Sequence, residues 1–183
     1  MAFATEADLR YPIGKFERPE RLTESERRAA IQQIEQAPAR LRAAVAGLND
    51  QQLDTPYRPG GWTIRQTIHH VADSHMNAFS RFKLALTEDE PIIKPYDEAA
   101  WAKLGDVNET PVETSLDLLD SLHERWVKVL RTMDDAAFLR HFVHPELGKI
   151  RLDGNLALYA WHGKHHTGHV RSVGQPLLAA SRL

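Results

Sequence analysis

The chain has 183 residues, a length that suits one domain, and its 42% hydrophobic and 26% charged residues are the ordinary balance of a globular protein. A formal net charge of −2 excludes the strong positive field of a protein that binds nucleic acid or an anionic membrane. The sequence has no cysteine, which excludes disulfides, a thiolate nucleophile and cysteine-ligated metals. It also lacks a secretory signal and an apolar stretch of membrane-spanning length, so we expect a cytoplasmic protein.

The N-terminal part of the chain predicts an arm followed by a first helix. Residues 1–22 contain two prolines, a glycine and little periodicity, so we expect an irregular N-terminal arm. A hydroxyl at Thr23 and a carboxylate at Glu26 form a capping box, which predicts that a helix begins there. Apolar residues continue at helical spacing to Leu48. Pro38 lies inside this run and is expected to kink or divide the helix.

The middle of the chain predicts one long and one short helix. Turn residues at 54–61 indicate a loop, and a second capping box, from Thr63 to Gln66, starts a helix that ends near Thr87. Two further prolines break the chain after that point. Residues 97–104 then predict one short helix.

The last part of the chain predicts two more long helices. Apolar spacing favours a helix from about 114 to 132, then a turn or two over 134–139 and a short β-hairpin within 141–152. The fourth long helix is expected from about 155 to 172. A glycine and a proline follow it, so residues 174–183 are expected to form a frayed C-terminal tail.

Four amphipathic helices joined by irregular segments predict an all-α fold. The expected architecture is a four-helix bundle with short extra helices and a small β-hairpin, in one domain over residues 23–173. The long connections between the helices leave their spatial order open.

Histidine is concentrated in two of the predicted helices. Seven of the ten histidines fall there, three in the second long helix and four in the last: His69, His70, His75, His162, His165, His166 and His169. The other three are interpreted as structural or solvated: His123, His141 and His144.

The spacing of these histidines predicts a metal site. His162 with His166, and His165 with His169, are pairs four residues apart, which puts two imidazoles on one helical face. Because two ligands rarely hold a metal firmly, a third is expected from the adjacent pair 69–70, of which only one can face the same point. Spacing alone leaves both pairs, and both candidates for the third ligand, open.

Three neutral imidazoles would leave a position open on the metal, which is typical of a catalytic site rather than a structural one. A water bound there has its pKa lowered to about 7 and becomes a nucleophile at neutral pH. Gly163 follows His162 where the H-E-x-x-H pattern of zinc peptidases needs glutamate, so that class is not favoured. Asp73, three residues after His70, is the candidate for the general base, or for a hydrogen bond that orients a ligand.

Several segments resemble a known family. The runs YPIG, LDTPYRPGGWTIRQTIHHVADSHMN, FKLALTE, PYDEAAW and YAWHGKHHTGHV are similar to the YfiT family of metal-dependent hydrolases, within the DinB-like superfamily, from about Leu9 to Val173. The resemblance implies a DinB-like four-helix bundle, a homodimer and one divalent metal per chain, with zinc favoured over nickel. Carried over by position, the ligands are His70, His162 and His166.

One part of the resemblance is incomplete. In the wider superfamily the last segment commonly reads H-x-x-x-H-R-G-Q, whereas Thr167 and His169 stand here in place of the arginine and the glutamine. The two ligand positions are unaffected, but the lining of the pocket is expected to differ.

The favoured function is a metal-dependent hydrolase that uses a metal-activated water on a small-molecule substrate. Similar proteins are also described as bacillithiol S-transferases, so the alternative is transfer of a metal-bound low-molecular-weight thiol to an electrophile. A metal-binding protein without catalysis is the third possibility. An acidic thiol would be favoured by basic residues near the site, for which the candidates are Arg65, Arg81, Lys164 and Arg171.

Overall fold

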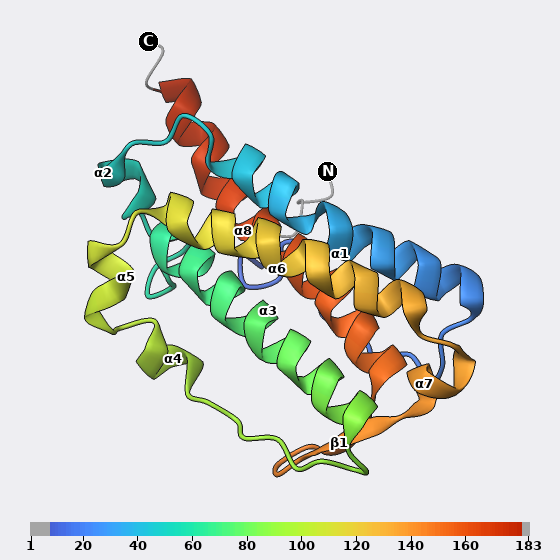
Figure 1. Cartoon of the computed structure of the whole chain (residues 1–183). Coiled ribbons are helices and arrows are strands. Elements are labelled where there is room, and N and C mark those ends of the chain that lie inside the picture. The colour runs from blue at the N-terminus through green and yellow to red at the C-terminus, as the bar shows by residue number, and fades with distance from the viewer. Residues whose placement is uncertain (1–7, 181–183) are drawn as a thin grey trace.

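Four long helices make up the body of the computed structural model, which describes residues 8–180: α1 (Glu24–Val45), α3 (Ile64–Thr87), α6 (Val112–Thr132) and α8 (Leu152–Ala180). They lie side by side, with α1 against α6 and α8, and α3 against the same two helices (Figure 1). Helices α1 and α8 run in one direction, and α3 and α6 in the opposite one (Figure 1). The predicted all-α four-helix bundle is confirmed.

Short elements occupy the connections between the long helices. They are α2 (Asp50–Leu53), α4 (Glu98–Trp101), α5 (Gly105–Glu109), α7 (Asp135–Leu139), β1 (His141–His144) and β2 (Gly148–Arg151). The two strands form the expected hairpin, antiparallel with Phe142 opposite Ile150. The connection over 88–111, with α4 and α5, returns along the bundle (Figure 1), which allows the neighbours α3 and α6 to run parallel.

The two predicted capping boxes fix the starts of α1 and α3. The Thr23 side chain accepts from the Glu26 N–H, and the Glu26 carboxylate accepts from the Thr23 N–H in return. Thr63 and Gln66 make the same reciprocal pair, at 3.1 and 3.0 Å. These local bonds satisfy amide donors that the first turn of a helix leaves without partners, so both helices begin where the sequence predicts.

Of the two outcomes expected at Pro38, a kink or a division of the helix, the division does not occur, because α1 runs from Glu24 to Val45 without interruption. Proline lacks an N–H, so the carbonyl four residues earlier, at Ile34, loses its helical partner. That carbonyl instead accepts a hydrogen bond from the imidazole Nδ1 of His123 on α6, at 2.7 Å. A side chain from a neighbouring helix therefore satisfies the group that the proline leaves free.

The frayed tail predicted over 174–183 is also wrong for the residues that the structure describes, since α8 continues to Ala180. A Cβ on Gly174 would lie 3.4 Å from the Ala44 carbonyl oxygen, so glycine allows α8 to lie close to the end of α1. The carbonyl of Leu177 accepts from the Gln52 side chain at 3.4 Å. These contacts hold the helix together beyond the glycine. Residues 1–7 of the predicted arm and 181–183 of the tail lie outside the described residues.

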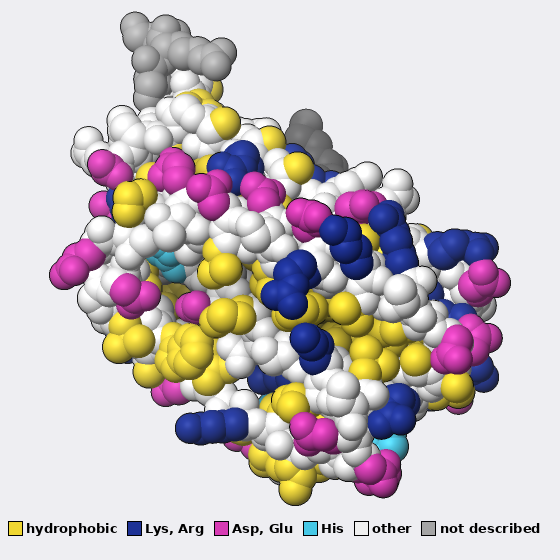
Figure 2. All heavy atoms as spheres, viewed as in Figure 1, with side chains coloured by type: hydrophobic (Ala, Val, Ile, Leu, Met, Phe, Trp, Pro, Cys, Tyr) yellow, Lys and Arg dark blue, Asp and Glu magenta, His cyan; other side chains and the backbone are white. Residues whose placement is uncertain are grey.

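The core has two apolar clusters along the bundle. One contains Phe82, Trp126 and Leu156, and the other contains Ile68 and Leu116, all almost fully buried. The face formed by α1 and α6 carries charged side chains of both signs and scarcely any visible histidine (Figure 2). Between residues 8 and 180 no helix combines the length and the apolar character needed to cross a membrane.

Candidate metal centre

Three of the predicted residues meet at the contact between α3 and α8. The ligand nitrogens of His70, His162 and His166 all lie within 4.8 Å of one another. Two of them, the Nε2 atoms of His70 and His162, are 3.3 Å apart. With zinc–nitrogen bonds of about 2.0–2.1 Å, the edge of a tetrahedral site is roughly 3.3–3.4 Å long. The donor set and its spacing therefore fit a divalent metal ion.

Burial keeps these imidazoles in the form that binds metal. It lowers the pKa of His70 to about 4 and holds the pKa values of His162 and His166 well below the ordinary range. Because a metal competes with protons for the same lone pairs, neutral imidazoles are the ligand form. All three side chains are thus ready to bind a cation at neutral pH.

The ligand nitrogens of a second group, His165, His166 and His169, also lie within 4.8 Å of one another. Some of these nitrogens, however, already take part in hydrogen bonds within the protein. The His169 Nε2 donates to the backbone carbonyl of Arg10 at 3.2 Å, and its Nδ1 lies 3.4 Å from the His166 Nδ1. A neutral His169 therefore accepts at Nδ1 from the Nδ1–H of His166. This leaves the Nε2 of His166 with a free lone pair, as the first group requires.

The structure separates the two adjacent candidates on α3. His69 faces α6, where its Nδ1 lies 2.7 Å from the Ser115 hydroxyl, and it belongs to neither histidine group. His70 faces α8 and contacts both His162 and His166 by its ring, with centroids 5.4 and 4.9 Å apart. The structure thus brings His70, rather than His69, to the pair on α8.

A cavity of about 540 Å³ opens over the three histidines. Its walls are rich in aromatic side chains: Tyr57, Trp62, Tyr96, Tyr159 and Trp161. Four arginines line it: Arg10, Arg18, Arg58 and Arg81. Glu98 is the one carboxylate among the described lining residues. Arg10 pairs with Asp8, and the other three leave the lining with an excess of positive charge. This composition suits an anionic small molecule with an apolar portion.

The basic residues near the site differ from those expected. Of the four candidates from the sequence, only Arg81 lines the cavity. Arg65 is buried and paired with Asp50 and Asp54, at 2.9 and 2.7 Å. The sequence pattern did not point to the arginines of the arm or of the 54–61 loop, because no periodicity places those segments beside the histidines.

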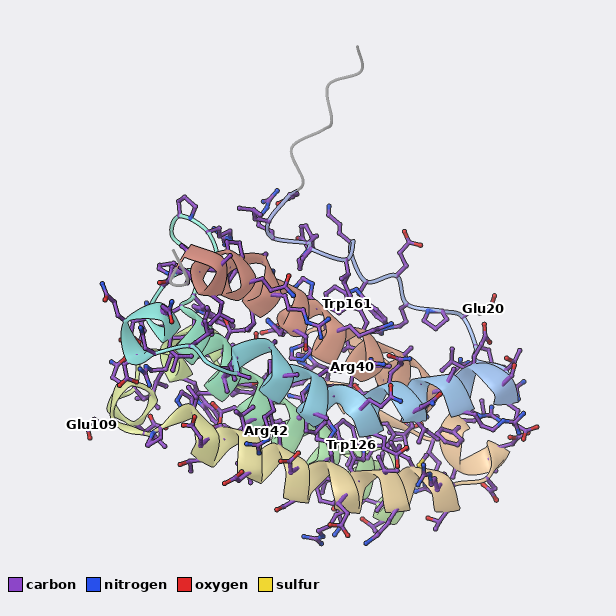
Figure 3. The ribbon with its side chains drawn as sticks, turned by 90° about the horizontal axis from the view of Figure 1, so that it is seen from above. Glu20, Arg40, Arg42, Glu109, Trp126 and Trp161 are labelled. Atoms are coloured by element: carbon purple, nitrogen blue, oxygen red, sulfur yellow. The ribbon has the colours of Figure 1, made fainter. Side chains whose placement is uncertain are left out.

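The N-terminal arm covers the outer side of α8. Phe16 packs on Trp161 with ring centroids 5.7 Å apart, and the arm runs along the helix on that side (Figure 3). A Cβ on Gly168 would lie 3.0 Å from the Pro12 side chain, so the absence of a side chain there allows this close approach. The arm, irregular over residues 8–22 as predicted, is therefore part of the site's enclosure.

Asp73 lies on α3, three residues after His70, but is not part of the histidine centre. It belongs to neither histidine group and does not line the cavity. Burial, with a smaller contribution from Asp106, raises its pKa to about 6. Its role as a base or orienting group stays a prediction.

Replacing Asp73 by asparagine is expected to stabilise the protein more at pH 7.5 than at pH 4.5. A carboxyl whose pKa rises from 3.8 to about 6 on folding contributes stability below pH 3.8 that is lost as pH rises through 6. Asp73→Asn removes the half-buried charge. The two pKa values give a difference between the two gains of about 2 kcal/mol, and the partial exposure of the carboxylate to solvent reduces it to about 1 kcal/mol. Urea unfolding at both pH values measures it. Equal gains at both would contradict the burial argument.

The fold and the site together define a class of protein: a four-helix bundle in which three imidazoles converge at a cavity and could hold a metal ion. Comparison with known proteins gives the family. The sequence model of the DinB superfamily matches residues 33–170, and the chain belongs to that superfamily.

Close relatives share nearly the whole chain. Proteins of Bacillus mycoides (strain KBAB4) and Bacillus cereus (strain B4264), each named "Putative metal-dependent hydrolase", are 52% identical over 170 residues, which is 93% of this chain and 98% of each relative. The solved structure of YfiT from Bacillus subtilis, described as a probable metal-dependent hydrolase with an unusual four-helix bundle topology, matches with a TM-score of 0.89 and 47% identity, over 92% of this chain and 97% of that one. The resemblance to the YfiT family is confirmed.

A more distant structure shares the fold alone. TT2238, described as a four-helix bundle protein, matches with a TM-score of 0.55 and 21% identity, over 84% of this chain and 98% of that one.

Proposed function

We propose that this protein is a metal-dependent hydrolase in which His70, His162 and His166 hold one divalent ion, zinc rather than nickel. The observation that carries the proposal is the position of three imidazoles, two buried and that of His162 partly exposed, with nitrogens within 4.8 Å, at the lining of a cavity large enough for a small molecule. The names of the relatives support the dependence on metal.

The ion would supply a nucleophile near neutral pH, because a coordinated water has its pKa lowered to about 7. The protein's own side chains bind and orient the substrate. Arg18, Arg58 and Arg81 present positive charge to an anionic group. The aromatic walls exclude water from the apolar portion.

Hydroxyl groups on one wall offer hydrogen bonds to the reacting group. The Tyr159 and Ser74 oxygens are 3.3 Å apart, and the Tyr159 ring also packs against that of His162, with the two rings tilted by 44° and their centroids 5.4 Å apart. Burial raises the pKa of Tyr96 and of Tyr159, so both phenols stay protonated and can donate. These residues are candidates to stabilise developing negative charge, a role that the sequence pattern did not assign to them.

Transfer of a thiol is the second candidate function. The cavity has an excess of arginine at its lining, and the chain has no cysteine, so an acidic low-molecular-weight thiol would have to bring its own sulfur. A metal ion held by the three histidines would favour the thiolate form of that thiol. The homodimer and the cytoplasmic location remain predictions under either function.

Zinc-loaded protein distinguishes the two functions. We expect it to hydrolyse members of a panel of anionic esters and amides, and to lose this activity after chelation and regain it with zinc. In parallel, each cellular thiol is mixed with an electrophile, and the conjugate is followed by mass spectrometry. Hydrolysis without conjugate supports the hydrolase. Metal-dependent conjugate without hydrolysis replaces it by the transferase, and neither activity at full zinc occupancy favours a binding protein.

A further inference from the structure

A row of buried histidines connects the metal centre to the far side of the bundle. The Nδ1 of His162 lies 3.1 Å from the Nε2 of His75 on α3. The Nδ1 of His75 lies 2.8 Å from the Nε2 of His123 on α6, and the Nδ1 of His123 lies 2.7 Å from the carbonyl oxygen of Ile34 on α1. His75 and His123 are 0% and 2% exposed. Four helices thus contribute to one continuous line of hydrogen bonds.

The carbonyl at one end determines the direction of every bond in the row. A carbonyl only accepts, so the Nδ1 of His123 carries the proton and its Nε2 is a lone pair when the ring is neutral. His75 must therefore donate from Nδ1 and accept at Nε2, and His162 must donate from Nδ1. The remaining nitrogen of His162, Nε2, then carries no proton, and its lone pair faces His70. This is the tautomer that a metal ligand needs.

Pro38 explains why the carbonyl of Ile34 is available for this task. In an unbroken helix the N–H of residue 38 would donate to the carbonyl of residue 34, and proline has no N–H. The α1 helix is continuous across this position, so the free carbonyl stays in place and points at His123. A proline that weakens a helix in isolation therefore frees the Ile34 carbonyl, which is the fixed acceptor at the end of the row.

Aromatic side chains lie against the two inner rings of the row, those of His75 and His123. Trp126 presents its ring edge-on to His75 and His123, with centroids 5.9 and 5.5 Å apart. Gly163 also lies beside His75, where a Cβ would be in ordinary van der Waals contact with the Cε1 of the ring, at 3.7 Å. Burial lowers the pKa of His123 to about 4, which keeps it neutral at pH 7.

We propose that Pro38, His123 and His75 are positioning residues that fix the tautomer and the ring orientation of His162 as a metal ligand. The inference rests on the proposed metal site. Partners of this kind behind metal-bound histidines typically change metal affinity 10–100-fold when they are removed. The contact from His166 through His169 to the Arg10 carbonyl is similar, so each histidine that α8 brings to the centre is connected to a backbone carbonyl, His162 through two imidazoles and His166 through one.

Nuclear magnetic resonance of the metal-free protein tests the row without reference to activity or metal. Proton–nitrogen correlation spectra of ¹⁵N-histidine-labelled protein at pH 7.5 report which ring nitrogen carries the proton. We expect His123, His75 and His162 all to be protonated at Nδ1. A proton on the Nε2 of any of the three would overturn the proposal, whatever the outcome for the proposed enzyme.

Zinc affinity of matched variants tests the effect on the ligand. His123→Leu is expected to weaken zinc binding about 10–100-fold, measured by competition with a chromogenic chelator, whereas His123→Gln, which can both donate and accept, restores most of it. His69→Leu is the control, since it deletes another buried histidine between α3 and α6, bonded to Ser115 instead of to the row. Circular dichroism confirms that each variant is folded. Zinc binding by His123→Leu at the native level, or an equal loss in His69→Leu, would contradict the proposal.

Pro38→Ala separates positioning from stability. Alanine restores the N–H that competes for the Ile34 carbonyl, and it is a far better helix former than proline. We expect zinc affinity to fall several-fold while the midpoint of thermal unfolding does not fall. Native affinity in this variant, with the His123 contact to Ile34 lost, would show that the carbonyl does not act on the metal ligand.

Discussion

His162→Ala and His166→Ala are each expected to bring the zinc content of the purified protein from about one ion per chain to less than about a tenth of that. Either change leaves two imidazoles, which rarely hold a metal firmly. The residues that carry this expectation lie with their nitrogens within 4.8 Å of each other and of His70. Elemental analysis of protein prepared without chelator or a metal-affinity column gives the content directly.

His141→Ala is the matched control for these variants. His141 lies on β1, where its Nε2 contacts the Glu90 carboxylate at 2.8 Å, and it belongs to neither histidine group. Its replacement should leave the zinc content unchanged. If His162→Ala and His166→Ala keep as much zinc as His141→Ala, the ligand set is wrong. Loss in His165→Ala and His169→Ala instead would move the site to the second histidine group.

Zinc is expected to raise the midpoint of thermal unfolding by roughly 8–16 °C when free zinc exceeds its dissociation constant about 1,000-fold. At that ratio, binding to the folded state alone contributes about 4 kcal/mol, and each kcal/mol shifts the midpoint of a chain of this size by about 2–4 °C. The ion would join α3, which carries His70, to α8, which carries the other two ligands. Calorimetric scans of chelated and zinc-loaded protein measure the shift.

Histidines of the unfolded chain also bind zinc, which reduces the rise in the unfolding midpoint. Two variants therefore serve as controls for the measurement. His141→Ala should show the full rise and His162→Ala almost none. A rise of equal size in His162→Ala would mean that the stabilising ion sits elsewhere in the protein.

Helix starts were predictable because they depend on residues close together in the sequence. Thr23 and Thr63 each find their capping partner three residues away, so local chemistry decides the boundary. The continuation of α1 through Pro38 and of α8 past Gly174 was not predictable. Both depend on groups from other helices, namely the imidazole of His123 and the closely packed end of α1. Tertiary contacts there override the local preference for a break.

The site was predictable where it depends on spacing along one helix, and not where it depends on how the helices pack. The spacing of His162 and His166 is a local property of a helix, but the choice between His69 and His70 depends on which neighbour lies on each side of α3. The resemblance to a family made that choice where spacing alone did not. Asp73 was expected to point at the centre from its position one turn after His70, but the structure does not place it at the cavity. Helical spacing gives a face, not the depth at which a side chain lies.

The arm that lies along α8 contributes to the cavity but not to the four long helices. A chain shortened to begin at Leu22 would keep all the residues of the four long helices and of both apolar clusters. It would also lose the Arg10 carbonyl behind His169, the ring of Phe16 on Trp161 and two arginines of the cavity. The part of the chain that forms the bundle is therefore shorter than the part that forms the cavity over the three histidines.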